Sequence, residues 1–291
     1  MRKIKIILSI DGGGIRGILP LTVLDYLNKK IVKNGIATSI NDATNLFAGT
    51  STGAIITSSL MLRNETDYLF RPSDLLSLYA SRGPQIFDKG RGENRNEYPL
   101  KLILDNNFGS ITMNDLHKCF VFVSYDERSK KPFVFSSRLE QYRNVPLSKV
   151  LLACSAVPAY FPAVELGPYY LSDGIQTAKN PSRLAYDHAK AYYPDSLVFM
   201  LSLGTGKLPE SMQDEVEKQV KETHEDLTLL SQSCDDFIYH RIEPELNRAN
   251  PAMDDTSKDN IQALIEDGNE FVQKNKTALK LIVKSWAKMK A

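Results

Sequence analysis

The glycine-rich segment near the start of the chain, "IKIILSIDGGGIRGILP" over residues 4–20, places the strongest constraint on the fold. Its first part, Ile4–Ile10, is a nearly continuous apolar run of the kind that forms a strand buried on both faces of a parallel sheet. Asp11 ends this run, three glycines follow, and helical spacing of apolar residues begins at Ile18. Glycine lets the backbone turn sharply and bring its N–H groups close to an anion at the start of a helix. Two anions fit this position: the pyrophosphate of a dinucleotide, or the oxyanion that forms when an ester is cleaved.

The alternation of strand and helix patterns along the chain predicts the fold class. Further strands are expected at residues 46–49, 120–125, 132–136, 164–171 and 197–203, and helices at 18–34, 52–62, 73–81, 147–155 and 182–192. This order indicates an α/β protein, a three-layer sandwich with a mostly parallel central sheet. Only helices are expected after about Leu208, so residues 1–207 are interpreted as the core and residues 208–291 as a helical C-terminal extension packed on it, within a single domain. The polar, glycine-rich residues 82–99 are expected to form a rim or lid.

Composition excludes several classes of protein. The 291 residues are 42% hydrophobic and 24% charged with a formal net charge of +1, which is ordinary for a globular protein and argues against a nucleic-acid partner. The three cysteines are scattered without a CxxC pair, so we expect a reducing compartment and neither disulfides nor a zinc site. The apolar run after the basic start is too short for a signal peptide, and no run reaches the ~20 residues of a membrane span. We therefore expect a cytoplasmic protein.

The dinucleotide interpretation rests on three glycines. Gly12, Gly14 and Gly17 match the spacing G-x-G-x-x-G. A dinucleotide site also needs an acidic residue at the end of the second strand, where it binds the ribose hydroxyl. The second strand here ends in "FAGTSTGAII", and no carboxylate lies between Asp42 and Glu65. The sequence therefore favours the ester over the nucleotide.

A second glycine-flanked motif, "GTSTG", follows the second strand. Its spacing G-x-S-x-G is typical of a strand-to-helix elbow, in which Ser51 occupies a strained backbone conformation at the tip while Gly49 and Gly53 give the chain room to bend. The alternative is a tight turn built from small residues. Because the first glycine loop ends a neighbouring strand, we interpret Ser51 as a nucleophile. The backbone amides of Gly13 and Gly14 then stabilise the oxyanion.

A serine nucleophile needs a base. The four histidines are His117, His188, His224 and His240. None follows a strand in the way that a Ser-His-Asp triad requires, and their simplest interpretation is a surface or partly buried position on helices. Asp173 in "YYLSDGIQ" ends an extended segment and is followed by Gly174, which suits a carboxylate directed into a cleft. The alternative is a plain Asp-Gly turn.

These motifs carry a family resemblance. "DGGGIRG", "GTSTG" and "DG", in that order, resemble the patatin-like phospholipases, lipid acyl hydrolases that use a Ser–Asp dyad. The resemblance extends from about Ile4 to Gly206 and includes "LLACSAVPAYFP", "DGIQTAKNP" and "LSLGTG". It implies a patatin-like catalytic core. Ile175 is a departure, because the family usually has Gly or Ala after the Asp-Gly pair.

The resemblance also implies a role for each site residue. Ser51 matches the nucleophile and Asp173 the general base, and Gly13 and Gly14 match the oxyanion-hole donors. Arg16 occupies the position of the family's basic residue, where a cation either holds the glycine loop or meets a lipid phosphate. The other interpretation of Arg16 is a surface side chain that pairs with a carboxylate.

The resulting hypothesis is a phospholipase A or lysophospholipase that cleaves fatty-acyl esters through an acyl-enzyme, without a metal or cofactor. Its expected partners are a phospholipid or another acyl-ester lipid and the surface of a membrane, with an activating ligand or protein left unassigned. A thioesterase or acyltransferase on the same fold, or a binding module with little turnover, stays open. The segment "KNKTALKLIVKSWAKMK" at the C-terminal end bears on the last alternative. Its helix has one apolar stripe and one lysine stripe, so it either lies on anionic lipid or packs on the domain through Trp286.

Overall fold

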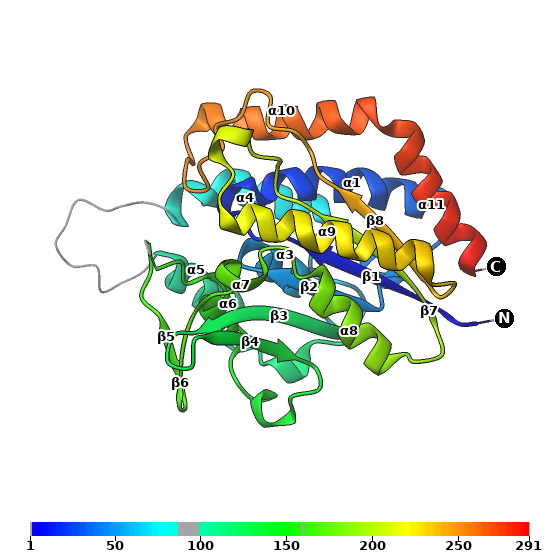
Figure 1. Cartoon of the computed structure of the whole chain (residues 1–291). Coiled ribbons are helices and arrows are strands. Elements are labelled where there is room, and N and C mark those ends of the chain that lie inside the picture. Colours follow the sequence, from blue (N-terminus) through cyan, green and yellow to red (C-terminus); the bar gives the residue numbers. More distant parts are fainter. Residues whose placement is uncertain (1, 87–98, 159, 291) are drawn as a thin grey trace.

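The computed structural model describes residues 2–86, 99–158 and 160–290 (Figure 1). Among these residues, eight strands form one mixed sheet with helices on both faces. The strands are β1 (Ile4–Ile10), β2 (Leu46–Thr50), β3 (Cys119–Asp126), β4 (Lys131–Ser136), β5 (Val164–Leu166), β6 (Tyr169–Asp173), β7 (Leu197–Leu203) and β8 (Phe237–Ile242). The α-helices are α1 (Ile18–Lys33), α2 (Ile40–Ala43), α3 (Thr52–Met61), α4 (Pro72–Ile86), α5 (Pro99–Phe108), α6 (Leu147–Ser155), α7 (Ile175–Ala178), α8 (Ser182–Tyr192), α9 (Glu215–Ser233), α10 (Lys258–Lys274) and α11 (Lys276–Lys290). The 3₁₀ helices are η1 (Gly14–Gly17), η2 (Met113–Asp115), η3 (Glu140–Tyr142) and η4 (Glu210–Met212).

The sheet has a parallel centre and an antiparallel margin. Strands β8, β7, β1, β2 and β3 are parallel neighbours, whereas β4 and β6 pair with β3 in the antiparallel sense and β5 pairs with β6. In register, Ile10 of β1 lies opposite Gly49 of β2 and Leu203 of β7, so the carboxyl ends of these strands meet at one edge. Ligands of open α/β sheets bind at this edge. The three-layer α/β fold predicted from the sequence is confirmed.

Both faces of the sheet are covered, which explains the continuous apolar strands. Leu8 and Ile10 of β1 pack in one core with residues of α1, α3, α6 and α11. Ile7, which points to the opposite face, packs in a second core with residues of α8 and α9, the two helices drawn in front of the sheet in Figure 1. A strand with two buried faces gains from apolar side chains at every position rather than at alternate ones.

Two expectations about secondary structure need correction. Residues 237–242 are not helical, because they form β8 parallel to β7 and extend the sheet. Phe237 and Tyr239 are buried against α8 and α9, and this tertiary burial outweighs the acidic, helix-rich surroundings in sequence. The expected loop at residues 82–99 overlaps two helices at its ends, because α4 continues to Ile86 and α5 begins at Pro99. Residues 87–98, on which the expected rim or lid mainly falls, lie outside the described residues.

Helix α11 packs on the domain through its apolar stripe. Leu279, Ile282, Val283 and Trp286 are buried, and the indole ring meets the ring of Phe199 edge to face with centroids 5.9 Å apart. Helix α11 therefore lies with its apolar stripe against the domain, and its lysine stripe is exposed. No helix in the described part of the chain combines the length and apolar character that a membrane crossing needs.

We expect Trp286→Ala to lower the free energy of unfolding by about 3–5 kcal/mol, because it leaves a large cavity against Phe199. Trp286 is the single tryptophan, so unfolding in urea is followed by circular dichroism. Leu281→Ala is the matched control on the same helix, since the Leu281 side chain is 58% exposed. Equal losses in the two variants would contradict the packing described for α11.

Candidate active site

The predicted elbow is present at the end of β2. Ser51 follows the strand, caps the N-terminus of α3 and has a backbone φ of 54° and ψ of −125°. A positive φ is uncommon for a residue other than glycine and marks a strained position. The flanking glycines are required by space, since a Cβ on Gly49 would lie 2.3 Å from the backbone of Gly53, and a Cβ on Gly53 would lie 2.1 Å from the carbonyl oxygen of Ile10. Helix α3 can therefore start directly against the strands.

Strand register brings Asp173 to Ser51. Strand β2 pairs with β3 as far as Thr50, which lies opposite Val123, and β6 pairs with β3 from Asp173, which lies opposite Ser124. Strand β4 occupies the other side of β3 over these residues, so β2 and β6 lie on the same side. The two strands run toward each other and their carboxyl ends meet.

The carboxyl group of Asp173 is fully buried. Its Oδ1 accepts a hydrogen bond of 2.8 Å from the backbone N–H of Ile175, and Oδ2 makes no hydrogen bond of ordinary geometry within the described residues. Burial raises the pKa of Asp173 to about 7, although the nearby Ser51 hydroxyl and the Ile175 amide act to lower it. Gly174 permits this position, because a Cβ there would lie 2.5 Å from the carbonyl oxygen of Val123. Ile175, the departure from the family pattern, thus contacts the carboxyl group through its backbone N–H, which does not depend on the side chain.

The glycine loop offers two backbone donors beside the serine. The amides of Gly12 and Ile15 each donate to a backbone carbonyl 3.0 Å away. Those of Gly13 and Gly14 donate to no acceptor in the described part of the chain. A Cβ on Gly12 would lie 3.3 Å from the Cβ of Ser51, which places the loop against the elbow. Backbone amides without an acceptor, close to a serine, are one feature that an oxyanion hole requires.

An ion pair that the sequence did not predict supports the loop. Arg241 of β8 donates through Nη1 and Nη2 to the two carboxylate oxygens of Asp11, at 2.7 and 2.6 Å, and also pairs with Glu243. Burial raises the pKa of Asp11 to about 6, while the guanidinium of Arg241 acts to lower it. On the other side, Thr205 Oγ1 donates to the carbonyl oxygen of Gly12 at 2.6 Å. Arg241 could not be found from the sequence because its strand was not predicted.

Arg16 lies inside the loop rather than on the surface. Its side chain is buried, forms no ion pair within the described residues and donates through Nε to the carbonyl oxygen of Gly13 at 3.4 Å. Burial lowers the pKa of the guanidinium. The surface interpretation of Arg16 is therefore wrong, and its contact is with the loop. The last motif glycine, Gly17, allows η1 to approach α3, since a Cβ there would lie 2.7 Å from Thr52 Oγ1.

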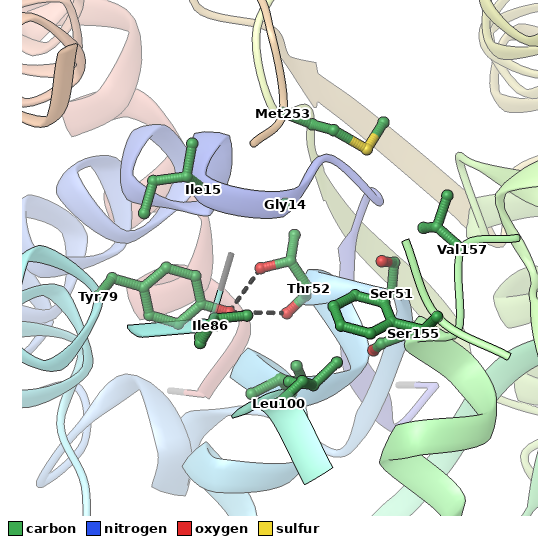
Figure 2. Close-up of a pocket in the computed structure, with 12 residues that line it drawn as sticks. Gly14, Ile15, Ser51, Thr52, Tyr79, Ile86, Leu100, Ser155, Val157 and Met253 are labelled. Atoms are coloured by element: carbon green, nitrogen blue, oxygen red, sulfur yellow. Dashed lines mark hydrogen bonds between the residues drawn. The ribbon is translucent and has the colours of Figure 1, made fainter. Parts of the chain in front are cut away.

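A small cavity of about 40 Å³ opens beside Ser51 (Figure 2). Most of its lining is apolar and includes Ile15, Ile55, Leu100, Val157, Phe161 and Met253. Gly14 of the loop and the hydroxyl-bearing Ser155 also line it. Tyr79 closes one side, where its hydroxyl is held by Thr52 Oγ1 at 2.5 Å.

The histidines lie elsewhere. None of the four lines this cavity. Two expectations need correction, because neither His117 nor His240 lies on a helix. His117 is exposed between η2 and β3, and His240 lies on β8 and packs on the ring of Phe199. Burial lowers the pKa of His188, His224 and His240. No three His, Cys, Asp or Glu side chains among the described residues are grouped so that they could hold a metal ion.

A serine on a strand–turn–helix elbow, set beside free amides and a buried carboxyl, defines a class of α/β proteins with a nucleophile elbow. The family model of patatin-like phospholipases matches residues 8–186, more than half of the chain, so the chain belongs to the patatin-like phospholipase family. This confirms the resemblance carried by the motifs.

Individual relatives agree. Patatin-like protein 2 of Oryza sativa subsp. indica is 29% identical over 218 residues, which cover 65% of this chain and 54% of that protein. Patatin-16 of Solanum tuberosum is 26% identical over 219 residues, which cover 72% and 55%. The chain thus spans about half the length of the curated relatives it matches. Human GIVD cytosolic phospholipase A2 shares the fold with a TM-score of 0.53 at 8% identity, over 98% of this chain and 60% of that one.

The buried carboxyl makes stability depend on pH. Between the ordinary pKa of an aspartate and about 7, folded Asp173 holds a proton that the unfolded chain releases, so the free energy of unfolding falls as pH rises through this window. In the wild type this loss is about 1.4 kcal/mol of unfolding free energy per pH unit. We expect Asp173→Asn to remove it, because asparagine does not titrate. The stability of the variant relative to the wild type should therefore increase from pH 4 to pH 7.

The measurement is urea unfolding at a series of pH values. Asp195→Asn, at an exposed position, is the control and should follow the wild type. A constant difference between Asp173→Asn and wild type across the series would contradict the raised pKa.

Proposed function

We propose that the chain is a serine lipid acyl hydrolase that cleaves fatty-acyl esters of phospholipids or lysophospholipids through a Ser51–Asp173 dyad. The observation that carries the proposal is the meeting of the Ser51 hydroxyl with a buried carboxyl whose pKa is about 7. Family membership supports the reaction class, and the apolar cavity beside Ser51 supports an acyl substrate. The activity is that of a phospholipase A or lysophospholipase.

In the first step, Asp173 accepts the proton of Ser51 as Oγ attacks the ester carbonyl carbon. The carbonyl oxygen becomes negative and accepts hydrogen bonds from the amides of Gly13 and Gly14, which donate to no other group in the described residues. Loss of one such donor typically costs about 3 kcal/mol of transition-state stabilisation. The lysolipid or alcohol then leaves with the proton from Asp173, and the acyl group stays on Ser51 as an ester.

In the second step, water attacks the acyl-enzyme while Asp173 takes one of its protons. The bond from the acyl carbon to Ser51 Oγ breaks, the serine regains a proton from Asp173, and the fatty acid is released. A free aspartate is too weak a base for this chemistry, but burial brings the pKa of Asp173 to the range in which a general base works best near neutral pH. Neither step needs a metal or cofactor.

Substrate entry requires the site to widen. A cavity of about 40 Å³ holds little more than water, so the apolar side chains around it must move apart to admit an acyl chain. A lipid substrate also brings the enzyme to a membrane surface, and we propose a cytoplasmic protein that associates with it peripherally. The exposed lysine stripe of α11 offers contact with anionic headgroups, while its apolar stripe is occupied by the core.

The dyad is tested with single variants and a mixed phospholipid extract, with products identified by mass spectrometry. We expect Ser51→Ala and Asp173→Asn to lower fatty-acid release by at least about a thousandfold, because nucleophile and base act as a unit. Replacement of each histidine by glutamine should retain activity within about tenfold, since none lines the cavity. Circular dichroism checks that each variant folds.

An essential histidine would replace the dyad with a triad. Turnover of thioesters alone would favour a thioesterase, and lipid binding without turnover would favour a binding module.

The pH dependence of kcat/KM gives a second test. Because only the deprotonated carboxylate can accept the serine proton, we expect kcat/KM to rise about tenfold per pH unit below about 7 and to level off above it. A chromogenic fatty-acyl ester provides the readout. A rate that falls with rising pH in this range would show that Asp173 is not the base.

A further inference from the structure

One polar group in the cavity has no part in the mechanism above. Ser155 is the last residue of α6 and lines the same cavity as Ser51, as Figure 2 shows. Its side chain is 5% exposed, and its Oγ has no hydrogen-bond partner among the described residues. A buried hydroxyl without a partner costs stability, so most are paired.

Neighbouring buried hydroxyls follow that rule. Ser58 Oγ of α3 donates to the carbonyl oxygen of Ile55 at 3.0 Å. Ser124 Oγ of β3 is within 2.9 Å of the carbonyl oxygen of Ala153 and 2.7 Å of another backbone carbonyl. The unpaired state of Ser155 is therefore a local exception, and it occurs where a reacting molecule must enter.

The residues on either side of Ser155 tie it to the dyad. The backbone N–H of Asp173 donates to the carbonyl oxygen of Ala156 at 3.0 Å. Burial raises the pKa of the Cys154 thiol, and the charge of Asp173 acts on it in the same direction, so this side chain also lies near the carboxyl. The end of α6 thus flanks Asp173 and directs the Ser155 hydroxyl to the cavity side of Ser51.

We propose that the Ser155 hydroxyl binds the water that hydrolyses the acyl-enzyme, and so acts in the second step of the reaction. This inference rests on the proposed function. A bound water needs at least two polar partners and little space, and Ser155 offers an unpaired hydroxyl at the part of the cavity next to Ser51. We assign Ser155 Oγ, which lines the cavity, as one partner, and as the second the carboxylate of Asp173, which is not part of that lining but lies next to the Ser51 hydroxyl.

The geometry explains why the group matters after acylation. Before acylation, the carboxyl of Asp173 faces the Ser51 hydroxyl. Once Ser51 carries the acyl group it has no proton to give, so the carboxylate is free to accept one proton of the water. The second water hydrogen is donated to Ser155 Oγ, which leaves an oxygen lone pair directed at the acyl carbon. The water oxygen forms the new bond, the bond to Ser51 Oγ breaks, and the proton on Asp173 passes to Ser51.

The test is Ser155→Ala with a chromogenic fatty-acyl ester under pre-steady-state conditions. We expect the rate of acylation, and therefore kcat/KM, to stay within about twofold of wild type, whereas kcat and KM fall together by about tenfold or more. The variant should release a burst of chromophore equal to the enzyme concentration, and intact-protein mass spectrometry should show the acyl group on it. Its midpoint of thermal unfolding should not fall, because an unpaired hydroxyl is removed.

Ser148→Ala is the matched control, since Ser148 is a buried serine of the same helix that does not line the cavity, and it should keep wild-type kcat and KM. Equal losses of acylation and deacylation in Ser155→Ala, or no loss of either, would overturn the inference while leaving the dyad intact. Wild-type turnover that survives Ser51→Ala would instead overturn the proposed function, and this inference with it.

Discussion

The end-to-end meeting of β2 and β6 along one side of β3 determines the geometry of the site. Most open α/β sheets present the carboxyl ends of parallel strands side by side, so their functional groups come from neighbouring strands. Here an antiparallel strand lies in line with a parallel one, and their last residues face each other across the gap between Thr50 and Asp173. A carboxyl group positioned in this way lies next to the Ser51 hydroxyl without an intervening side chain.

Several energetically unfavourable features occur together at this site. Ser51 has a positive φ, the carboxyl of Asp173 is buried, and Ser155 Oγ and Arg16 Nη1 are buried without partners among the described residues. Each of these costs stability, and such groups persist where function requires them and the rest of the fold holds them in place. The two cores on the faces of the sheet supply that support.

Much of this site could be predicted because its signals are local. The spacing of Gly49, Ser51 and Gly53 encodes an elbow, and an Asp-Gly pair after an extended run encodes the end of β6. The position of β8 could not be predicted, because "FIYHRI" is short and carries two polar residues within a helix-rich, acidic region. Its pairing with β7 begins with Val198 opposite Phe237, and the ion pair between Asp11 and Arg241 joins residues 230 positions apart. A local sequence pattern does not predict a contact between residues so far apart in the chain.

The C-terminal region contacts the glycine loop directly. The glycine loop that carries the two free amides is anchored at Asp11 by Arg241 and at Ile15 by the carbonyl oxygen of Met253, at 3.0 Å. Both anchors lie beyond residue 186, where the family match ends. Removing one partner of a buried ion pair leaves an uncompensated charge that destabilises its surroundings strongly. Residues 208–291 therefore help to hold the glycine loop in place and are not an appendage to a complete core.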